Sequence, residues 1–230
     1  TESQSFNGRF TLEHDIDANW KVSGGLGFGR SDLNSIAIGN INRVAVEQGL
    51  YGCRVTPTSA PGGPGIIPGC VPVNIYGPGT ITDAARDFIQ TDTTDVASFE
   101  QQRASVNLVG TLFDLPGGSV GVALGAEIRK DSGETVPDDA KQRGEIIGFN
   151  QQQAVRGAIT AKEVYGEIRL PLLGGGGFPD MLAFELGGRY SDYDSLQDPL
   201  FNYKAAVEFA PINWLRFRGA YNKAARAPSV

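Results

Sequence analysis

Apolar and polar residues alternate along several segments of the chain, and a period of two residues predicts β-strands. In residues 5–14, Phe6, Phe10 and Leu12 share one face, whereas Arg9 and Glu13 share the other. The same pattern recurs in about eight segments in all: 5–14, 19–32, 99–115, 119–131, 162–173, 182–193, 201–210 and 214–223. We therefore predict an all-β protein whose sheet has one apolar face and one charged face.

The connections between these segments differ in length in a regular way. Short connections fall at 15–18, 115–119 and 210–213, modest ones at 173–181 and 194–199, and long ones at 33–95 and 131–159. In an up-and-down sheet, alternate connections emerge at the same end. Short turns at one end and long loops at the other are typical of outer-membrane barrels, whose long loops are extracellular. We predict an antiparallel up-and-down transmembrane β-barrel.

Strand length supports this prediction. A tilted strand needs about 9–11 residues to cross a bilayer, whereas soluble strands average about 5–6 residues. Aromatic residues also gather near predicted strand ends, as interface girdles do: Trp20, Phe113, Phe178, Phe184, Tyr190, Tyr193, Phe201, Tyr203, Phe209, Trp214 and Tyr221. A soluble β-sandwich alternates in a similar way and stays open as an alternative.

Composition narrows the possible functions and the compartment. Acidic residues outnumber basic ones by 26 to 20, which argues against a nucleic-acid-binding protein. Cys53 and Cys70 lie in a segment rich in proline and glycine, and the single histidine, His14, is far away. A metal site would need further ligands, so a disulfide is the preferred interpretation, and it implies an oxidising compartment.

No motif predicts catalysis, a cofactor or a metal. The glycines of "GGLGFGR" (24–30) lack the G-x-G-x-x-G spacing of a nucleotide loop. Paired carboxylates on the polar faces could suggest glycoside hydrolysis, but charges that line a barrel lumen and contact a plug explain them better. The predicted lumen-facing residues are Glu127, Arg129, Glu167, Arg169, Arg189, Arg216 and Arg218. We expect no enzyme activity.

The long segment 33–95 holds the candidate binding residues. Their position alone predicts ligand contact for Tyr51, Arg54, Asn74, Tyr76 and Arg86. The acidic residues Asp83, Asp87, Asp92 and Asp95 offer oxygen ligands for calcium, but their spacing differs from an EF-hand, so solvated charge is preferred. Thr82 is a good N-cap, which predicts a helical turn over 82–89.

Five stretches carry a resemblance to a known family. They are "VNIYGPGTITDAARDFI" (73–89), "GTLFDLPGGSVGVALGAEIRKD" (110–131), "EVYGEIRLPLL" (163–173), "LAFELGGRYSDY" (182–193) and "WLRFRGAYNKAARAPSV" (214–230). Together they resemble the β-barrel of TonB-dependent receptors, and Arg226, Ala227 and Pro228 match the Arg-Ala-Pro signature of that family.

The resemblance implies active uptake of a scarce ligand, such as a siderophore, cobalamin or a carbohydrate, across the outer membrane of a Gram-negative bacterium. It implies three partners: outer-membrane lipid, a plug domain and the inner-membrane TonB complex. No plug pattern is visible in residues 1–230, and barrels of this family have about 22 strands. We therefore expect residues 1–230 to be a partial barrel domain. A complete eight-stranded barrel with a structural or adhesion role and a secreted β-sandwich lectin or hydrolase remain alternatives.

Overall fold

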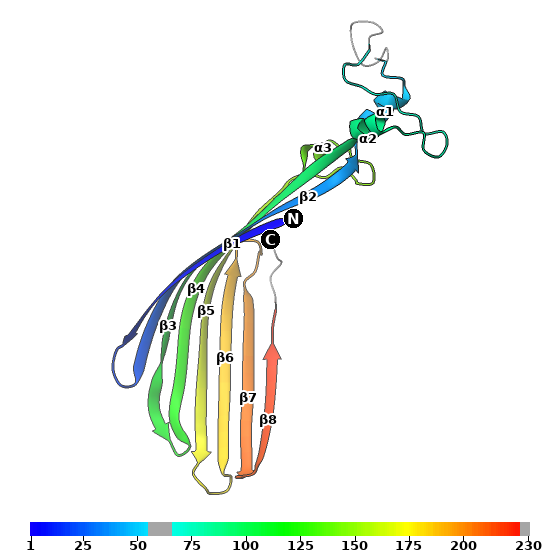
Figure 1. The fold of residues 1–230 in the computed structure, drawn as a ribbon. Coiled ribbons are helices and arrows are strands. Elements are labelled where there is room, and N and C mark those ends of the chain that lie inside the picture. Colours follow the sequence, from blue (N-terminus) through cyan, green and yellow to red (C-terminus); the bar gives the residue numbers. More distant parts are fainter. Residues whose placement is uncertain (55–65, 226–230) are drawn as a thin grey trace. The chain divides into compact units, whose positions relative to one another are not determined.

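The computed structural model describes residues 1–54 and 66–225 of the chain. Within them, eight strands form one antiparallel up-and-down sheet in chain order (Figure 1). The strands are β1 (Glu2–Asp15), β2 (Trp20–Ile41), β3 (Gln90–Leu115), β4 (Gly118–Val136), β5 (Val155–Gly174), β6 (Met181–Tyr193), β7 (Leu200–Ile212) and β8 (Leu215–Lys223). β1 and β8 are the two edges of this open sheet, which is neither a closed eight-stranded barrel nor a two-sheet sandwich.

The predicted up-and-down order is confirmed, but the predicted loop boundaries were wrong. β2 extends to Ile41 and β3 begins at Gln90, so the segment 33–95 is strand at both ends. β4 extends to Val136 and β5 begins at Val155, which likewise shortens the predicted loop 131–159. The extension at the start of β3 is polar, as "TDTTD" (91–95) shows, and backbone hydrogen bonds can hold a hairpin that has no apolar face.

The chain divides into two compact units, which we describe separately. The wall unit comprises 5–31, 99–133 and 157–230, and it holds most of the sheet. The loop unit comprises 1–4, 32–98 and 134–156, and it holds the strand extensions and the helices. The family signature at Arg226, Ala227 and Pro228 lies outside the described residues.

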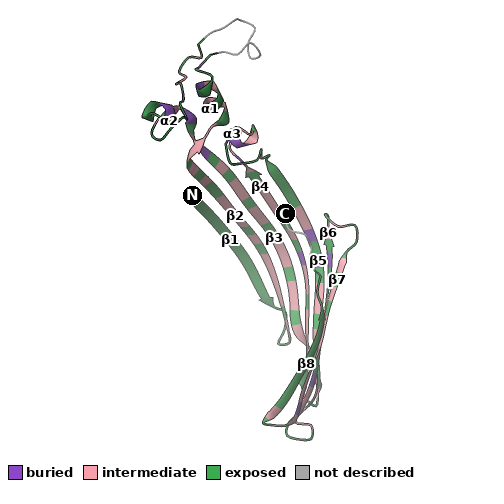
Figure 2. Ribbon diagram, turned by 90° about the vertical axis from the view of Figure 1, so that its right-hand side faces the viewer, coloured by how far each residue is buried: buried purple, intermediate pink, exposed green. Residues whose placement is uncertain are grey.

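The wall unit has the polarity of a membrane protein. Its large apolar side chains are exposed, including Phe10 (64%) and Leu26 (61%), whereas the carboxylates Glu127 (8%) and Glu163 (5%) are buried. Figure 2 shows how few residues of the strands are fully buried. Soluble proteins rarely bury an acidic residue and rarely expose a large apolar surface. This inverted distribution fits a sheet with lipid on one face.

Two helices of the loop unit pack around a small apolar core. The helices are α1 (Arg43–Leu50) and α2 (Asp83–Ile89), and the core comprises Val73, Ala85 and Ile89, with Ile41, Ala45, Val46, Val71 and Phe88 against it. The predicted N-cap is present, because Thr82 Oγ1 accepts a hydrogen bond from Ala85 N–H at 3.2 Å. A third short helix, α3 (Asp139–Gln142), follows β4. No helix among the described residues is long and apolar enough to cross a membrane.

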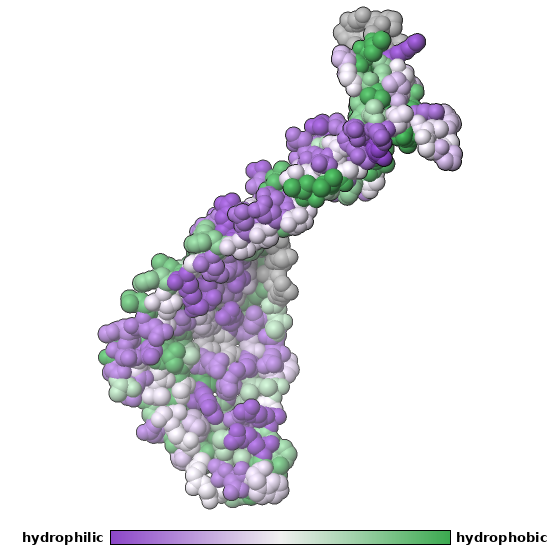
Figure 3. Space-filling model, in the orientation of Figure 1, coloured by the Kyte–Doolittle hydropathy of each residue, from purple (hydrophilic) through white to green (hydrophobic). Residues whose placement is uncertain are grey.

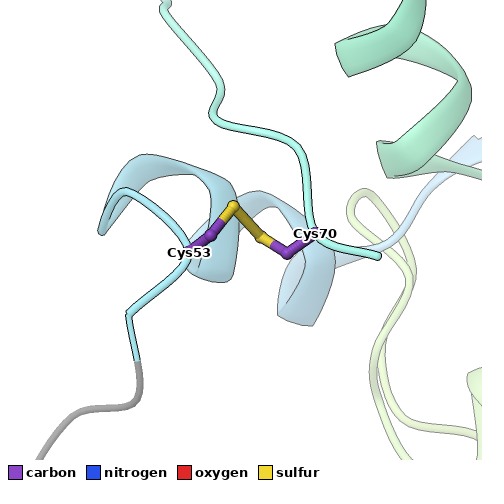
Figure 4. The surroundings of a disulfide bond; sticks show 2 residues. All are labelled: Cys53 and Cys70. Atoms are coloured by element: carbon purple, nitrogen blue, oxygen red, sulfur yellow. A yellow bond between two sulfur atoms is a disulfide. The ribbon is translucent and has the colours of Figure 1, made fainter. Parts of the chain in front are cut away.

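Cys53 and Cys70, the pair expected to form a disulfide, are joined in the structure (Figure 4). Their Cα atoms lie 5.6 Å apart, and Cys53 lies in the turn that follows α1. The backbone nearby is ordered by further bonds, since Cys53 N–H donates to Gln48 O and Val73 N–H donates to Gly49 O. The bond therefore ties the end of α1 to the segment that leads toward α2.

Candidate functional site

A buried carboxylate is the centre of the first polar cluster on the charged face of the wall unit. Glu163 Oε1 accepts hydrogen bonds from Ser191 Oγ at 2.7 Å and from Tyr193 OH at 3.1 Å. Its other oxygen, Oε2, accepts from Arg189 Nη1 at 3.1 Å. The antiparallel register of β5 and β6 pairs Glu163 with Ser191, so these side chains share one face. We call Glu163, Arg189, Ser191 and Tyr193 the Glu163 cluster.

An aromatic ring connects this cluster to two further strands. The Arg189 guanidinium lies 4.6 Å from the ring centre of Tyr165, which is a cation–π contact. Tyr165 OH donates to Asn107 Oδ1 on β3 at 2.6 Å. The ring lies across Gly125 of β4, where an added Cβ atom would be 2.3 Å from Tyr165. Glycine is therefore required at position 125 if the ring is to reach Asn107.

A second cluster surrounds Glu127 on β4. Arg103 Nη2 lies 2.6 Å from Glu127 Oε2, and Arg129 Nη1 lies 4.0 Å from Oε1. Arg129 Nε also lies 3.0 Å from Asp131 Oδ2, and Gln101 donates to Asp131 Oδ1 at 2.7 Å. A buried carboxylate without such partners is strongly destabilising. The two arginines thus hold the Glu127 side chain in place on this face.

A third cluster spans β5 to β8. Glu208 accepts from Arg169 at 3.2 Å and pairs with Arg218, its partner across β7 and β8. Lys204 pairs with Glu185 and lies 3.7 Å from Glu167. Figure 3 shows hydrophilic residues gathered over the strands of the wall unit. The ion pairs cross-link neighbouring strands along their polar face.

The structure brings together most of the residues that the sequence predicted to face the lumen. Glu127, Arg129, Glu167, Arg169, Arg189 and Arg218 all take part in these clusters. Arg216 makes no ion pair within the described part of the chain. The sequence did not single out Asn107, Tyr165 or Ser191, and it named Tyr193 only as an aromatic residue near a strand end, because the roles of these residues depend on cross-strand register. The available signal was the alternation within 162–173 and 182–193, which puts Tyr165 on the same face as Glu163, and Ser191 and Tyr193 on the same face as Arg189.

The five candidate ligand-contact residues of the loop unit differ in solvent exposure and in their contacts with the rest of the protein. Tyr51 (68%) and Tyr76 (84%) are exposed. The other three make contacts within the loop unit. Arg86 forms an ion pair with Asp83 in α2, and Asn74 Oδ1 accepts a hydrogen bond from Tyr76 N–H at 3.0 Å. Arg54 forms an isolated β-bridge with Ile66. No contact among the described residues joins all five into a single site.

Three of the four acidic residues considered as calcium ligands contact protein donors. Asp92 Oδ1 accepts from Gly39 N–H at 2.9 Å, and Asp95 accepts from Lys141 Nζ at 2.6 Å and Asp138 N–H at 3.0 Å. Asp83 pairs with Arg86. Within the described ranges, no three His, Cys, Asp or Glu residues converge as a metal site would require.

Lys141 is the buried partner that joins α3 to β3. Its side chain is 5% exposed, and its Nζ also lies 4.9 Å from the ring centre of Phe149. Burial raises the pKa of Asp95, but the hydrogen bonds from Lys141 and from Asp138 N–H outweigh it and hold that pKa below its ordinary value. Nearby, the Arg143 guanidinium lowers the pKa of Glu145 through bonds of 2.7 and 3.0 Å.

The two long connections of the loop unit are also tied to each other. Arg43 N–H donates to Glu145 O at 2.6 Å, and Ile147 N–H donates to Ile41 O at 2.9 Å. Asn42 and Ile146 form an isolated β-bridge between these bonds. The connection after β2 and the connection after β4 therefore share one hydrogen-bonded structure.

Comparison with known proteins accounts for the architecture. The family model described as "TonB dependent receptor-like, beta-barrel" matches residues 1–230. No curated protein and no solved structure matches the chain. The family consists of receptors that transport ligands, rather than enzymes, and is typical of the outer membrane. The chain belongs to the TonB-dependent receptor-like β-barrel family.

Proposed function

We propose that these residues form part of the barrel wall of a receptor that takes up a scarce ligand by active transport in a Gram-negative bacterium. The observation that carries the proposal is the inverted polarity of the wall unit, with exposed Phe10 and Leu26 and buried Glu127 and Glu163. In a barrel, the apolar face contacts lipid and the polar face lines the lumen. Further strands would pair with β1 and β8 to complete the barrel.

The charged face is the proposed contact surface for a plug domain. Its three clusters hold arginine and glutamate side chains in fixed positions, which favours recognition of a rigid polar partner over a mobile one. Arg103 and Arg189 are about half exposed although their glutamate partners are buried. Their remaining N–H groups would donate to acceptors on the plug. Contact of the plug-linked segment with the TonB complex would then drive transport.

Ligand capture is proposed for the loop unit. Tyr51 and Tyr76 present exposed rings, and Arg54, Asn74 and Arg86 lie in the same connection between β2 and β3. Aromatic rings with neighbouring polar groups suit siderophores, cobalamin and carbohydrates alike. The proposal therefore names these three ligand classes and gives none of them priority.

Uptake measurements test this function. A strain that lacks the gene for the full-length receptor is supplied with iron-loaded siderophores, cobalamin or maltodextrins, each radiolabelled, and accumulation is compared with the parent strain. We expect the loss of accumulation for one ligand class, restored by the gene and abolished when TonB is removed. Accumulation of every class unchanged by loss of the gene would contradict the proposal.

A further inference from the structure

The connection after β4, residues 137–154, folds back on itself, and we call it the strap. It contains α3, and just after that helix Glu145 N–H donates to Ala140 O at 2.8 Å. Further along, Gln152 N–H donates to Lys141 O at 3.2 Å, which ties the second half of the strap to α3. The strap is therefore a small folded body rather than an extended loop.

The strap is anchored to the start of β3. Lys141 Nζ donates to Asp95 Oδ2 at 2.6 Å, and the Lys141 side chain is only 5% exposed. Asp138 N–H donates to Asp95 Oδ1 at 3.0 Å, and Thr94 N–H donates back to Asp138 Oδ2 at 2.9 Å. Breaking a buried ion pair is strongly destabilising, so this anchor holds the strap firmly. Among the described residues, neither the Asp95 nor the Lys141 side chain bonds to α1 or α2.

A second anchor lies where β2 passes into α1. Asn42 forms an isolated antiparallel β-bridge with Ile146, a residue that is only 2% exposed. Two main-chain hydrogen bonds flank this bridge, Arg43 N–H to Glu145 O at 2.6 Å and Ile147 N–H to Ile41 O at 2.9 Å. The strap thus lies beside the end of β2 as a short additional strand.

Asn42 connects this second anchor to both α1 and α2. Its Oδ1 accepts a hydrogen bond from Ala45 N–H at 3.1 Å, which makes Asn42 the N-cap of α1. Its own N–H donates to Ile89 O, at the end of α2, at 2.8 Å. A helix of eight residues is marginal by itself, and loss of an N-cap destabilises it further. The geometry of one residue therefore links the strap to the stability of α1.

The two ends of α1 are held by different means. The disulfide between Cys53 and Cys70 lies beyond its C-terminal end, and the bridge to the strap lies at its N-terminal end. Within α1, only Gly49 is fully buried, so the small apolar core gives the helix limited support. The position of α1 consequently depends on the connections at its two ends.

We propose that the strap is a conformational device that holds α1 in place, so that its release from Asp95 on β3 loosens the helix through Asn42. Tyr51 is the C-cap of α1, and Arg54 follows it, so the strap also determines where these two candidate ligand contacts are presented. This consequence for ligand capture rests on the proposed function. The coupling between the strap and α1 does not rest on it.

Amide hydrogen exchange tests the coupling in the purified full-length receptor, kept in detergent without ligand. Asp95→Asn/Lys141→Met removes the anchor at β3, leaves no buried charge unpaired and changes no contact of α1. We expect exchange in residues 43–50 to become at least about tenfold faster, because a hydrogen bond to a charged group contributes that much or more to local stability. Exchange in β6 of the wall unit should stay unchanged, which shows that the barrel remains folded.

A pair of substitutions at one position tests the second anchor. Arg43→Pro removes the N–H that donates to Glu145 O, although proline at the first helical position favours a helix. Arg43→Ala keeps this N–H and removes only the exposed pair with Glu47. We expect exchange in residues 43–50 to rise about fivefold in Arg43→Pro and to change little in Arg43→Ala.

A matched control for the first anchor is Glu134→Gln/Arg156→Gln. It removes an ion pair of the same unit in which both side chains are exposed and which lies outside the strap. Exposed pairs contribute little to stability, so exchange in residues 43–50 should stay at the wild-type rate.

Three results would overturn the proposal. In a folded Asp95→Asn/Lys141→Met receptor, faster exchange confined to residues 137–154 would show that the strap does not hold α1. Equal exchange in Arg43→Pro and Arg43→Ala would show that the bond to Glu145 has no effect on the helix. An equal rise in β6 would mean that the whole fold is destabilised. Unchanged uptake after loss of the gene, with the coupling present, would count against the proposed function alone.

Discussion

Arg189 Nη1 donates a hydrogen bond of 3.1 Å to Oε2 of Glu163, a carboxylate whose side chain is only 3% exposed. The pair connects β5 and β6 on the charged face, and Ser191 and Tyr193 satisfy the other oxygen of Glu163. A buried carboxylate destabilises the fold unless it has such hydrogen-bond and ion-pair partners. The pair therefore marks the face of the wall unit that is turned away from lipid.

Glu163→Ala should destabilise the barrel by about 2–3 kcal/mol, because it leaves the buried Ser191 hydroxyl without its acceptor and removes the carboxylate from Arg189. The loss of stability is measured from the guanidinium chloride concentration at the midpoint of unfolding of the refolded receptor in detergent. Glu134→Ala is the matched control, since the Arg156–Glu134 pair is exposed and should contribute no more than about 1 kcal/mol. Equal effects of the two substitutions would contradict the assigned role of Glu163.

Gly125→Ala should displace the Tyr165 ring, since the new Cβ would lie 2.3 Å from it, and should cost about 1–3 kcal/mol. Gly121→Ala, in the same strand with no atom within 4 Å of the added Cβ, should have little effect. The effect is measured from the midpoints of unfolding. Asn107→Ala tests the hydrogen bond from the Tyr165 hydroxyl. In the Gly125→Ala background, where the ring is displaced, Asn107→Ala should cause almost no further loss of stability. Full additivity of the two substitutions would show that the ring stays in place.

Acid should loosen the connection between β4 and β5. The pKa of Asp95 is lowered in the folded state, so its contribution to stability is present above the unfolded value of about 3.9 and is lost as the pH falls through the folded value. We expect amide hydrogen exchange in residues 137–154 to rise, relative to the wall unit, below about pH 4. Asp95→Asn should reduce this step and leave the part that Glu145 contributes, whereas Asp87→Asn on α2 should leave the step unchanged. A step of full size in Asp95→Asn would contradict the role assigned to Asp95.

The disulfide should stabilise the loop unit without affecting the wall. Closure of a loop of this length contributes about 3 kcal/mol in the chain-entropy model, and the bond joins residues 17 apart. Cys53→Ser/Cys70→Ser should therefore speed cleavage of residues 43–89 by an added protease, while heat-modifiable mobility of the barrel stays unchanged. Reduction of the wild-type protein should reproduce the result. Loss of the folded barrel in the double variant would show that the bond acts on the whole fold.

The sequence predicted the strands that have a lipid-facing side, because such strands alternate in polarity. It missed the extensions of β2 and β3 because Thr93 and Thr94 offer no apolar face, although Ile36 and Ile38 alternate and were an overlooked signal. Thr82 was identified correctly because an N-cap is a local feature. The Glu163 cluster required the register of Glu163 with Ser191, which comes from the turn between β5 and β6 and has no signature in either strand alone.

The most direct test of the central claim is a cysteine scan along β6 of the full-length receptor in lipid vesicles. Single cysteines at 184, 185, 186 and 187 are labelled with a fluorophore and exposed to a quencher dissolved in the lipid. Phe184 and Leu186 belong to the apolar face, and Glu185 and Gly187 to the charged face. The account predicts strong quenching at 184 and 186 and weak quenching at 185 and 187. Uniform quenching along the strand, or strong quenching at 185 and 187, would contradict a wall that faces lipid on one side only.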